Sequence, residues 1–259
     1  MSAAPVPVAL NTFREAVRDR VLYNLIFFAL LMMGAAILVG QISIGIDRLV
    51  ILNLGLSAIS IIGLVMAVFI GVGLVSKEME KRTLYSLLAR PIRRWQFLLG
   101  KYAGLVLTLA VNTLFMTLGL AAALFYVGRP FVRSDGLVLV AVYFILLELA
   151  LVTALALFFS CFSSPMLSTL FTLGIYLTGC FASDIRTFGE FTKNPAIKTF
   201  TRVLYYLVPN FHNFNVIAAA AHGSRIPLSL VGNNTLYATF YVALLLVSAS
   251  AVFSARNLK

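Results

Sequence analysis

Long apolar stretches separated by short polar segments dominate the pattern of this 259-residue chain. A helix that crosses a bilayer needs about 20 mostly apolar residues. Six stretches reach that length, at about 21–40, 50–75, 102–127, 137–159, 165–182 and 235–254. We therefore expect an all-α integral membrane protein with six transmembrane helices, folded as a single transmembrane domain over residues 1–259.

The composition agrees with this pattern, because 61% of the residues are hydrophobic and only 11% are charged. Such values lie far outside the range of soluble globular domains. They exclude a separate water-soluble domain of ordinary size. The bilayer is therefore the expected solvent for most of the chain.

The segment 11–20 before the first span has the pattern of an interfacial helix. Leu10 and Phe13 recur at helical spacing, and Thr12 and Glu15 have the spacing of a capping box. The alternative is a disordered tail that runs into the first span.

Two further segments predict how the spans are connected. The short sequence "SCFSSP" between the fourth and fifth spans makes them antiparallel neighbours, with Ser163 and Ser164 capping a helix that begins at Pro165. The outer segment 183–234 is the longest non-spanning region. From Pro195 it has an amphipathic pattern typical of an outer-face interfacial helix, carried by Ile197, Phe200, Leu204 and Leu207. Pro209 breaks that pattern, and a short second helix ends at Gly223.

The basic residues set the expected orientation. Seven of the twenty Lys and Arg lie within 77–101, and short basic loops face the cytoplasm. Alternation then places both termini inside as well. We expect a multi-pass protein of the inner (cytoplasmic) membrane with cytoplasmic N- and C-termini.

Residues 78–90 have the pattern of a short helix across the cytoplasmic surface. Leu84, Leu87 and Leu88 fall on one side of it, and Pro91 cannot continue it. A basic loop whose side chains snorkel at lipid headgroups would explain the arginines alone. The glutamates and the leucine ridge favour a docking element for another protein.

Four segments of the chain resemble those of ABC-2 type transporter permeases. The most specific one runs Glu78, Thr83-Leu84, Leu87-Leu88, Pro91, Arg94, Phe97-Leu98-Leu99 and Gly100-Lys101. The segments "TFREAVRDRVLYN", "FFSCFSSPMLSTLFTLGIYLTG" and "YYLVPNFHNFNV" look like that family's N-terminal elbow helix, fourth-to-fifth span hairpin and proline-asparagine segment. Within that family the chain resembles the six-span NosY-like permeases. Arg82 departs from the pattern, because many relatives carry glycine there, and this puts the details of partner pairing in doubt.

The resemblance implies an ABC-2, type V exporter-like transmembrane domain in which 78–90 is a cytoplasmic coupling helix. The implied ATPase-coupling residues are Glu78, Glu80, Arg82, Thr83, Leu84, Leu87, Leu88, Arg90, Pro91 and Arg94. The implied partners are two copies of a cytoplasmic ABC ATPase subunit, a second permease copy or related permease, membrane lipid, and periplasmic or other accessory subunits; no nucleic acid is expected. ATP and Mg would bind the ATPase subunit. The chain has no Walker A loop, so it is not expected to be an enzyme.

Inside the membrane, Glu148 is the acidic residue near the middle of the fourth span, and Asn112 in the third span is its candidate hydrogen-bond partner. An ionised carboxylate at the bilayer centre costs about 2.5–3.5 kcal/mol. Glu148 therefore either lines the translocation path or fixes helix packing, and both remain open. Four glycines of the second span are expected to allow close helix packing. They are Gly55, Gly63, Gly71 and Gly73.

These observations make an exporting permease subunit the leading hypothesis. A non-transporting membrane scaffold or assembly factor that recruits a cytoplasmic partner is one alternative. A proton-coupled secondary transporter that uses Glu148 is another. We find no catalytic residues and no metal ligands at a suitable spacing.

Overall fold

The computed structural model describes residues 5–16, 47–80, 94–126, 136–192 and 194–255, with 27–28, 30–32, 34–35 and 38. Across these residues the secondary structure is helical, without strands. The α-helices are α1 (Pro5–Ala16), α3 (Asp47–Glu80), α5 (Arg94–Tyr126), α6 (Gly136–Ser160), α7 (Pro165–Cys180), α8 (Ala182–Phe191), α9 (Pro195–Leu207), α10 (Ile217–Ala221) and α11 (Leu228–Ala255). A 3-10 helix, η3, covers Phe211–Phe214.

Four helices in the described part of the chain, α3, α5, α6 and α11, are long and apolar enough to cross a membrane. The pair α7 and α8, bent by 59°, makes a fifth if it is counted as one span. This confirms the all-helical membrane architecture. The expected first span, 21–40, lies largely outside the described residues, although Phe28 and Met32 within it are buried against the core.

Two of the spanning helices are longer than their apolar sequence predicted. α3 has 34 residues and α5 has 33, which corresponds to about 50 Å each. A bilayer core of about 30 Å cannot cover that length. The last residues of α3 include 78–80, so the first three positions of the expected helix 78–90 continue the second span.

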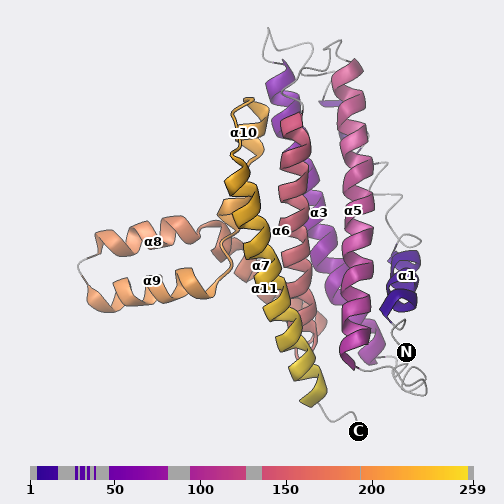
Figure 1. Cartoon of the computed structure of the whole chain (residues 1–259), viewed down its shortest axis with the longest axis vertical. Helices are drawn as coiled ribbons and strands as arrows, with labels where there is room; N and C mark the ends of the chain where they lie inside the picture. The colour runs from indigo at the N-terminus through magenta and orange to yellow at the C-terminus, as the bar shows by residue number, and fades with distance from the viewer. Residues whose placement is uncertain are drawn as a thin grey trace.

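Figure 1 places α1, the end of α3, the start of α5 and the end of α11 at one end of the bundle. That arrangement agrees with the alternation expected from the charges. α6 lies between α11 and the α3–α5 pair in the same view. It is the most buried of the four span-length helices, with 61% of its apolar window inside the structure.

Glycines bring neighbouring helices close to α3. A Cβ at Gly63 would overlap Leu149 of α6, and one at Gly55 would overlap Leu120 of α5. Gly71 lies against Ala156 of α6. Packing at these three positions is confirmed. The fourth expectation was wrong for the part of the chain that the structure describes, because no described atom lies within 4 Å of a Cβ placed at Gly73.

The N-terminal helix differs from its predicted boundaries. α1 begins at Pro5 rather than at residue 11, because proline is compatible with the first turn of a helix, where its missing N–H is not needed. Thr12 therefore lies inside the helix and does not cap it. Its side chain is 1% exposed and packs where Gly104 of α5 lets the two helices meet.

The connections on either side of α7 agree with the sequence in outline. Pro165 begins α7 after Ser164, but the Ser164 side chain forms no cap hydrogen bond, so that part of the prediction was wrong. α9 begins at Pro195 as expected, and the short helix α10 is followed by Gly223 with a φ of 70°. Figure 1 shows α8 and α9 projecting sideways from the bundle as a helical hairpin.

Candidate functional site

Glu148 is a carboxylate inside the most buried span. It occupies the middle of α6, and its side chain is 7% exposed. Apolar neighbours on the same helix, such as Ile145 and Leu149, are 1% exposed. No ion pair to Glu148 occurs among the residues that the structure describes. A charge in such a place needs hydrogen bonds from the protein or water.

The hydrogen bond comes from α7. The Tyr176 hydroxyl donates to Glu148 Oε1 over 2.8 Å. The short turn at 161–164 folds α7 back along α6. Tyr176 of α7 therefore lies at the same height along the hairpin as Glu148 of α6. The expected partnership between Glu148 and Asn112 was therefore wrong.

Asn112 belongs to α5 and lies away from Glu148, at the contact between α5 and α3. Its Nδ2 donates to Met66 Sδ over 2.7 Å and approaches Met116 Sδ at 3.7 Å. Thioether sulfur is a weak acceptor. The Asn112 side chain is 1% exposed, and its Oδ1 has no hydrogen-bond partner among the described atoms.

A polar cavity of about 90 Å³ opens beside Glu148. Its lining comes from five elements: Ser60 of α3, Ile145 and Glu148 of α6, Tyr176 and Cys180 of α7, Phe211, His212 and Phe214 of η3 with the adjoining Asn215, and Ile217 of α10. Since His212 and Asn215 are exposed, the cavity reaches the surface. It has room and polar partners for several water molecules, so Glu148 is accessible to small polar groups.

The η3 segment is held against α7 and α11. A Cβ at Gly179 would overlap the Pro209 carbonyl and the Phe211 ring, so glycine is required for this approach. The Phe211 ring lies 5.0 Å from that of Tyr176. On the other side, the Asn210 backbone N–H donates to the Tyr237 hydroxyl over 2.8 Å. The wall of the cavity is therefore fixed at both edges.

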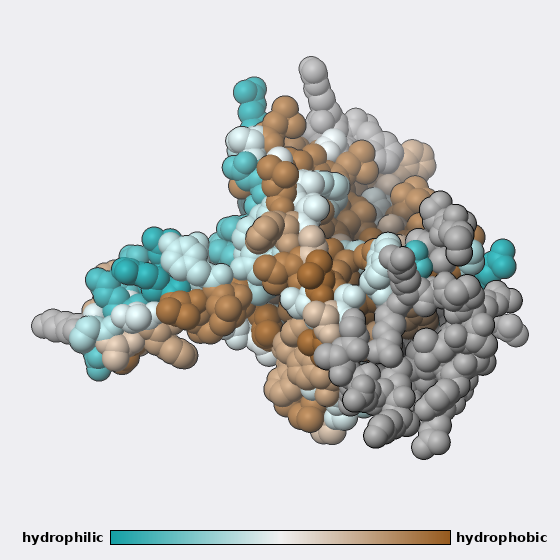
Figure 2. All heavy atoms as spheres, turned by 60° about the horizontal axis from the view of Figure 1, so that its bottom comes forward, coloured by the Kyte–Doolittle hydropathy of each residue, from teal (hydrophilic) through white to brown (hydrophobic). Residues whose placement is uncertain are grey.

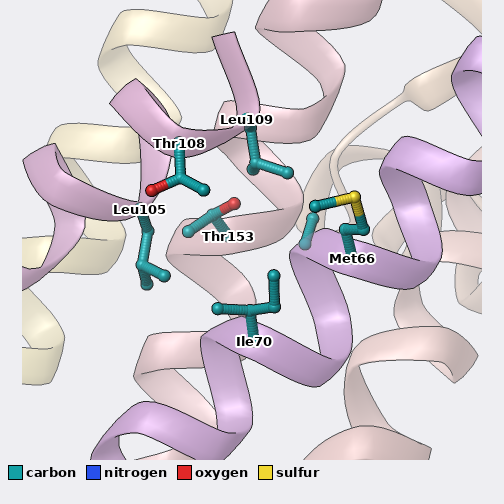
Figure 3. A pocket seen from close by; sticks show the side chains of 7 residues that line it. Met66, Ile70, Leu105, Thr108, Leu109 and Thr153 are labelled. Atoms are coloured by element: carbon teal, nitrogen blue, oxygen red, sulfur yellow. The ribbon is translucent and has the colours of Figure 1, made fainter. Parts of the chain in front are cut away.

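A second pocket lies between α3, α5 and α6 (Figure 3). Met66, Leu105 and Leu109 are among its lining side chains, and it has no room for a water molecule. The two hydroxyls that face it are satisfied within their own helices: Thr108 donates to the Gly104 carbonyl and Thr153 to the Leu149 carbonyl. This pocket is a packing gap without chemistry of its own.

The predicted coupling residues divide into two groups. Glu78 and Glu80 belong to the last turn of α3, and Arg94 begins α5. The remaining seven, Arg82, Thr83, Leu84, Leu87, Leu88, Arg90 and Pro91, lie outside the described residues. Ser60 of the cavity is on the same unbroken helix as Glu78 and Glu80.

Sequence reasoning missed Tyr176, His212 and Asn215 as neighbours of Glu148. One signal could have found Tyr176, because Glu148 and Tyr176 are each fourteen residues from Phe162 at the centre of the turn. The η3 residues carry no comparable signal. Across the described ranges, no group of three or more His, Cys, Asp or Glu side chains could hold a metal ion.

The chain matches one family model over nearly its full length. The model is described as ABC-2 family transporter protein, and the match covers residues 6–258. A search of curated proteins found no match.

Proposed function

Because the chain belongs to the ABC-2 transporter family, it is a membrane permease component of an ABC transporter, and we propose that it exports its substrate with energy from a separate cytoplasmic ATPase. Two ATPase subunits would dock on 78–90, and a second permease copy or a related permease would complete the pathway. ATP binding would shift the population between inward-open and outward-open arrangements.

The observation that carries this proposal is the continuity of α3. The helix runs without a break from Ser60, which lines the Glu148 cavity, to Glu80 at the start of the docking segment. The twenty residue steps from Ser60 to Glu80 span about 30 Å. A helix without a kink transmits a displacement of one end to the other as a rigid rod. Movement at the docking segment would therefore reach the cavity.

Glu148 supplies the second part of the proposal. We assign it to the translocation path, because its cavity opens to the surface at His212 and Asn215. A residue that only fixed helix packing would not need an opening. Small polar or charged groups of a substrate could meet the carboxylate there.

Co-purification tests the docking claim. The chain would be purified in lipid with the ATPase that it retains, alongside the triple variant Leu84→Ser, Leu87→Ser and Leu88→Ser. We expect the variant to lose the ATPase while it remains monodisperse. The control carries the same change at Leu139 of α6 and at Leu228 and Leu236 of α11, three exposed leucines outside the docking segment. Retention of the ATPase by the 84/87/88 variant would overturn the proposal.

Turnover separates this function from the two alternatives. Substrate-stimulated ATP hydrolysis by the complex is expected for a transporter and not for a scaffold or assembly factor. A proton-coupled carrier rests on Glu148 alone, and it would transport substrate without any ATPase. Transport by vesicles that contain only this chain would therefore favour the carrier.

A further inference from the structure

The α8–α9 hairpin is a rigid unit that leaves the bundle. A Cβ at Gly189 of α8 would overlap the Thr201 side chain of α9, so the two helices are in close contact. Thr201 is only 7% exposed. Because the bundle helices run along the membrane normal, a hairpin that projects sideways from them lies along the membrane plane (Figure 1).

The hairpin leaves the bundle part-way along its length (Figure 1). α7 has 16 residues and rises about 24 Å from the turn at 161–164 to Phe181, where α8 begins. The hydrocarbon core is about 30 Å thick. The start of α8 is therefore less than one core thickness from the turn.

The hairpin has one apolar side and one polar side (Figure 2). Large apolar side chains are exposed along both helices. They are Phe188, Phe191, Phe200, Val203 and Leu207. A helix with such a division lies in the interface, with its apolar face in the acyl region and its polar face toward the headgroups.

The polar side contains a small pocket of about 50 Å³. Its lining residues are Arg186, Gly189, Glu190, Lys198, Thr201, Arg202, Tyr205 and Tyr206. Three of them are cations and one is a carboxylate, so the pocket carries a net positive charge. Its tyrosines are of the type that concentrates at membrane interfaces.

Contacts within the pocket fix one of the cations in place. Arg186 Nε lies 3.2 Å from Glu190 Oε1, and the Arg186 guanidinium lies 5.0 Å above the Tyr205 ring. The only carboxylate of the pocket is therefore engaged by Arg186. Lys198 and Arg202 stand one turn apart on α9, and no carboxylate in the described part of the chain pairs with them.

We propose that this pocket binds the phosphate group of an anionic phospholipid. Arginine and lysine donors around a small polar space match the oxygen atoms of a phosphate. The exposed apolar side chains of the same hairpin provide a surface for the acyl chains. The proposal depends on the hairpin alone and not on ATPase docking.

Binding of short-chain lipids to the full-length protein in detergent tests the proposal. Native mass spectrometry would compare a phosphatidylglycerol with a phosphatidylcholine of equal chain length. We expect stronger binding of phosphatidylglycerol, and about a fivefold loss for each basic residue removed in the variants Lys198→Gln and Arg202→Gln. Binding of phosphatidylcholine should not change in either variant.

Arg225→Gln is the matched control, because Arg225 is an exposed arginine outside the hairpin. Its phosphatidylglycerol binding should equal that of the unmodified protein. An equal loss in Arg225→Gln, or no loss in the double variant at 198 and 202, would overturn the proposal. Competition by millimolar inorganic phosphate as strong as by the lipid would also overturn it, because the site would then bind free phosphate.

Discussion

The Tyr176 hydroxyl donates a 2.8 Å hydrogen bond to Glu148 Oε1 across the α6–α7 hairpin. This contact joins the one acidic side chain near the middle of α6 to the helix that leads into the projecting α8–α9 pair. It also gives a way to separate the packing role of Glu148 from a role in transport.

Glu148→Gln and Tyr176→Phe should differ in their effect on stability. The glutamine carbonyl still accepts the hydrogen bond, whereas phenylalanine cannot donate one. We expect Tyr176→Phe to lower the free energy of unfolding by about 1 kcal/mol and Glu148→Gln to leave it nearly unchanged. Thermal unfolding in nanodiscs measures both, and an equal loss in the two variants would contradict the assigned contact.

Glu148→Gln should also lower the activity of the complex. Glu148→Gln removes the negative charge from the cavity, and charged hydrogen-bonding groups contribute roughly 1.5–3 kcal/mol. If Glu148 contacts the substrate, the stimulation of ATP hydrolysis by the substrate should fall by about tenfold or more in Glu148→Gln. The stability of this variant should be unchanged. Full stimulation in Glu148→Gln would reduce the residue to a packing role.

Gly73 offers a test of α3 as a rigid connection. A proline there removes a backbone hydrogen bond and kinks the helix, at about 3 kcal/mol. Gly73→Ala is the matched control, because no described atom lies within 4 Å of the added Cβ. We expect Gly73→Pro to retain the ATPase but to lose substrate-stimulated hydrolysis. Normal stimulation in a folded Gly73→Pro variant would show that α3 does not carry the coupling.

Gly104→Ala should weaken the attachment of α1. The added Cβ would overlap the Ala9 carbonyl and Thr12, and overpacking of this kind costs typically 1–3 kcal/mol. Gly174→Ala is the control, since none of the described atoms lies within 4 Å of a Cβ at that position. Thermal unfolding of the two variants should separate them, and equal midpoints would argue against close α1–α5 packing.

Asn112→Leu should preserve or raise stability. The change removes a buried oxygen that has no partner among the described atoms, and an unsatisfied buried group costs roughly 1–3 kcal/mol. Asn112→Asp keeps the shape but buries a carboxyl group, so it should destabilise. A clear loss of stability in Asn112→Leu would reveal a polar partner of Asn112 in the assembled transporter.

The sequence predicted the features that depend on long-range pattern. The apolar runs predicted the positions of α3, α5, α6 and α11. The short turn before Pro165 predicted that α6 and α7 are neighbours. The burial of Glu148 followed from its position within an apolar span. These features rest on local composition and on the bilayer thickness, which a single sequence contains.

The features that were missed depend on which helix faces meet. Asn112 and Glu148 lie in adjacent spans, but Asn112 faces Met66 of α3 while Glu148 faces Tyr176 of α7. Helix rotation is set by packing partners, and apolar runs without amphipathic periodicity do not encode it. α8 was missed for a related reason, because its start continues the apolar sequence of α7 and the 59° bend between them has no proline.

The sideways projection of α8 and α9 has a consequence for the surrounding bilayer. A hairpin that lies along one membrane surface displaces lipid from that leaflet and not from the other. The protein is then wider in one leaflet, like a wedge. Proteins of this shape accumulate where the membrane is curved so that the leaflet with their wider part is convex. The hairpin would therefore bias where in the membrane the transporter accumulates.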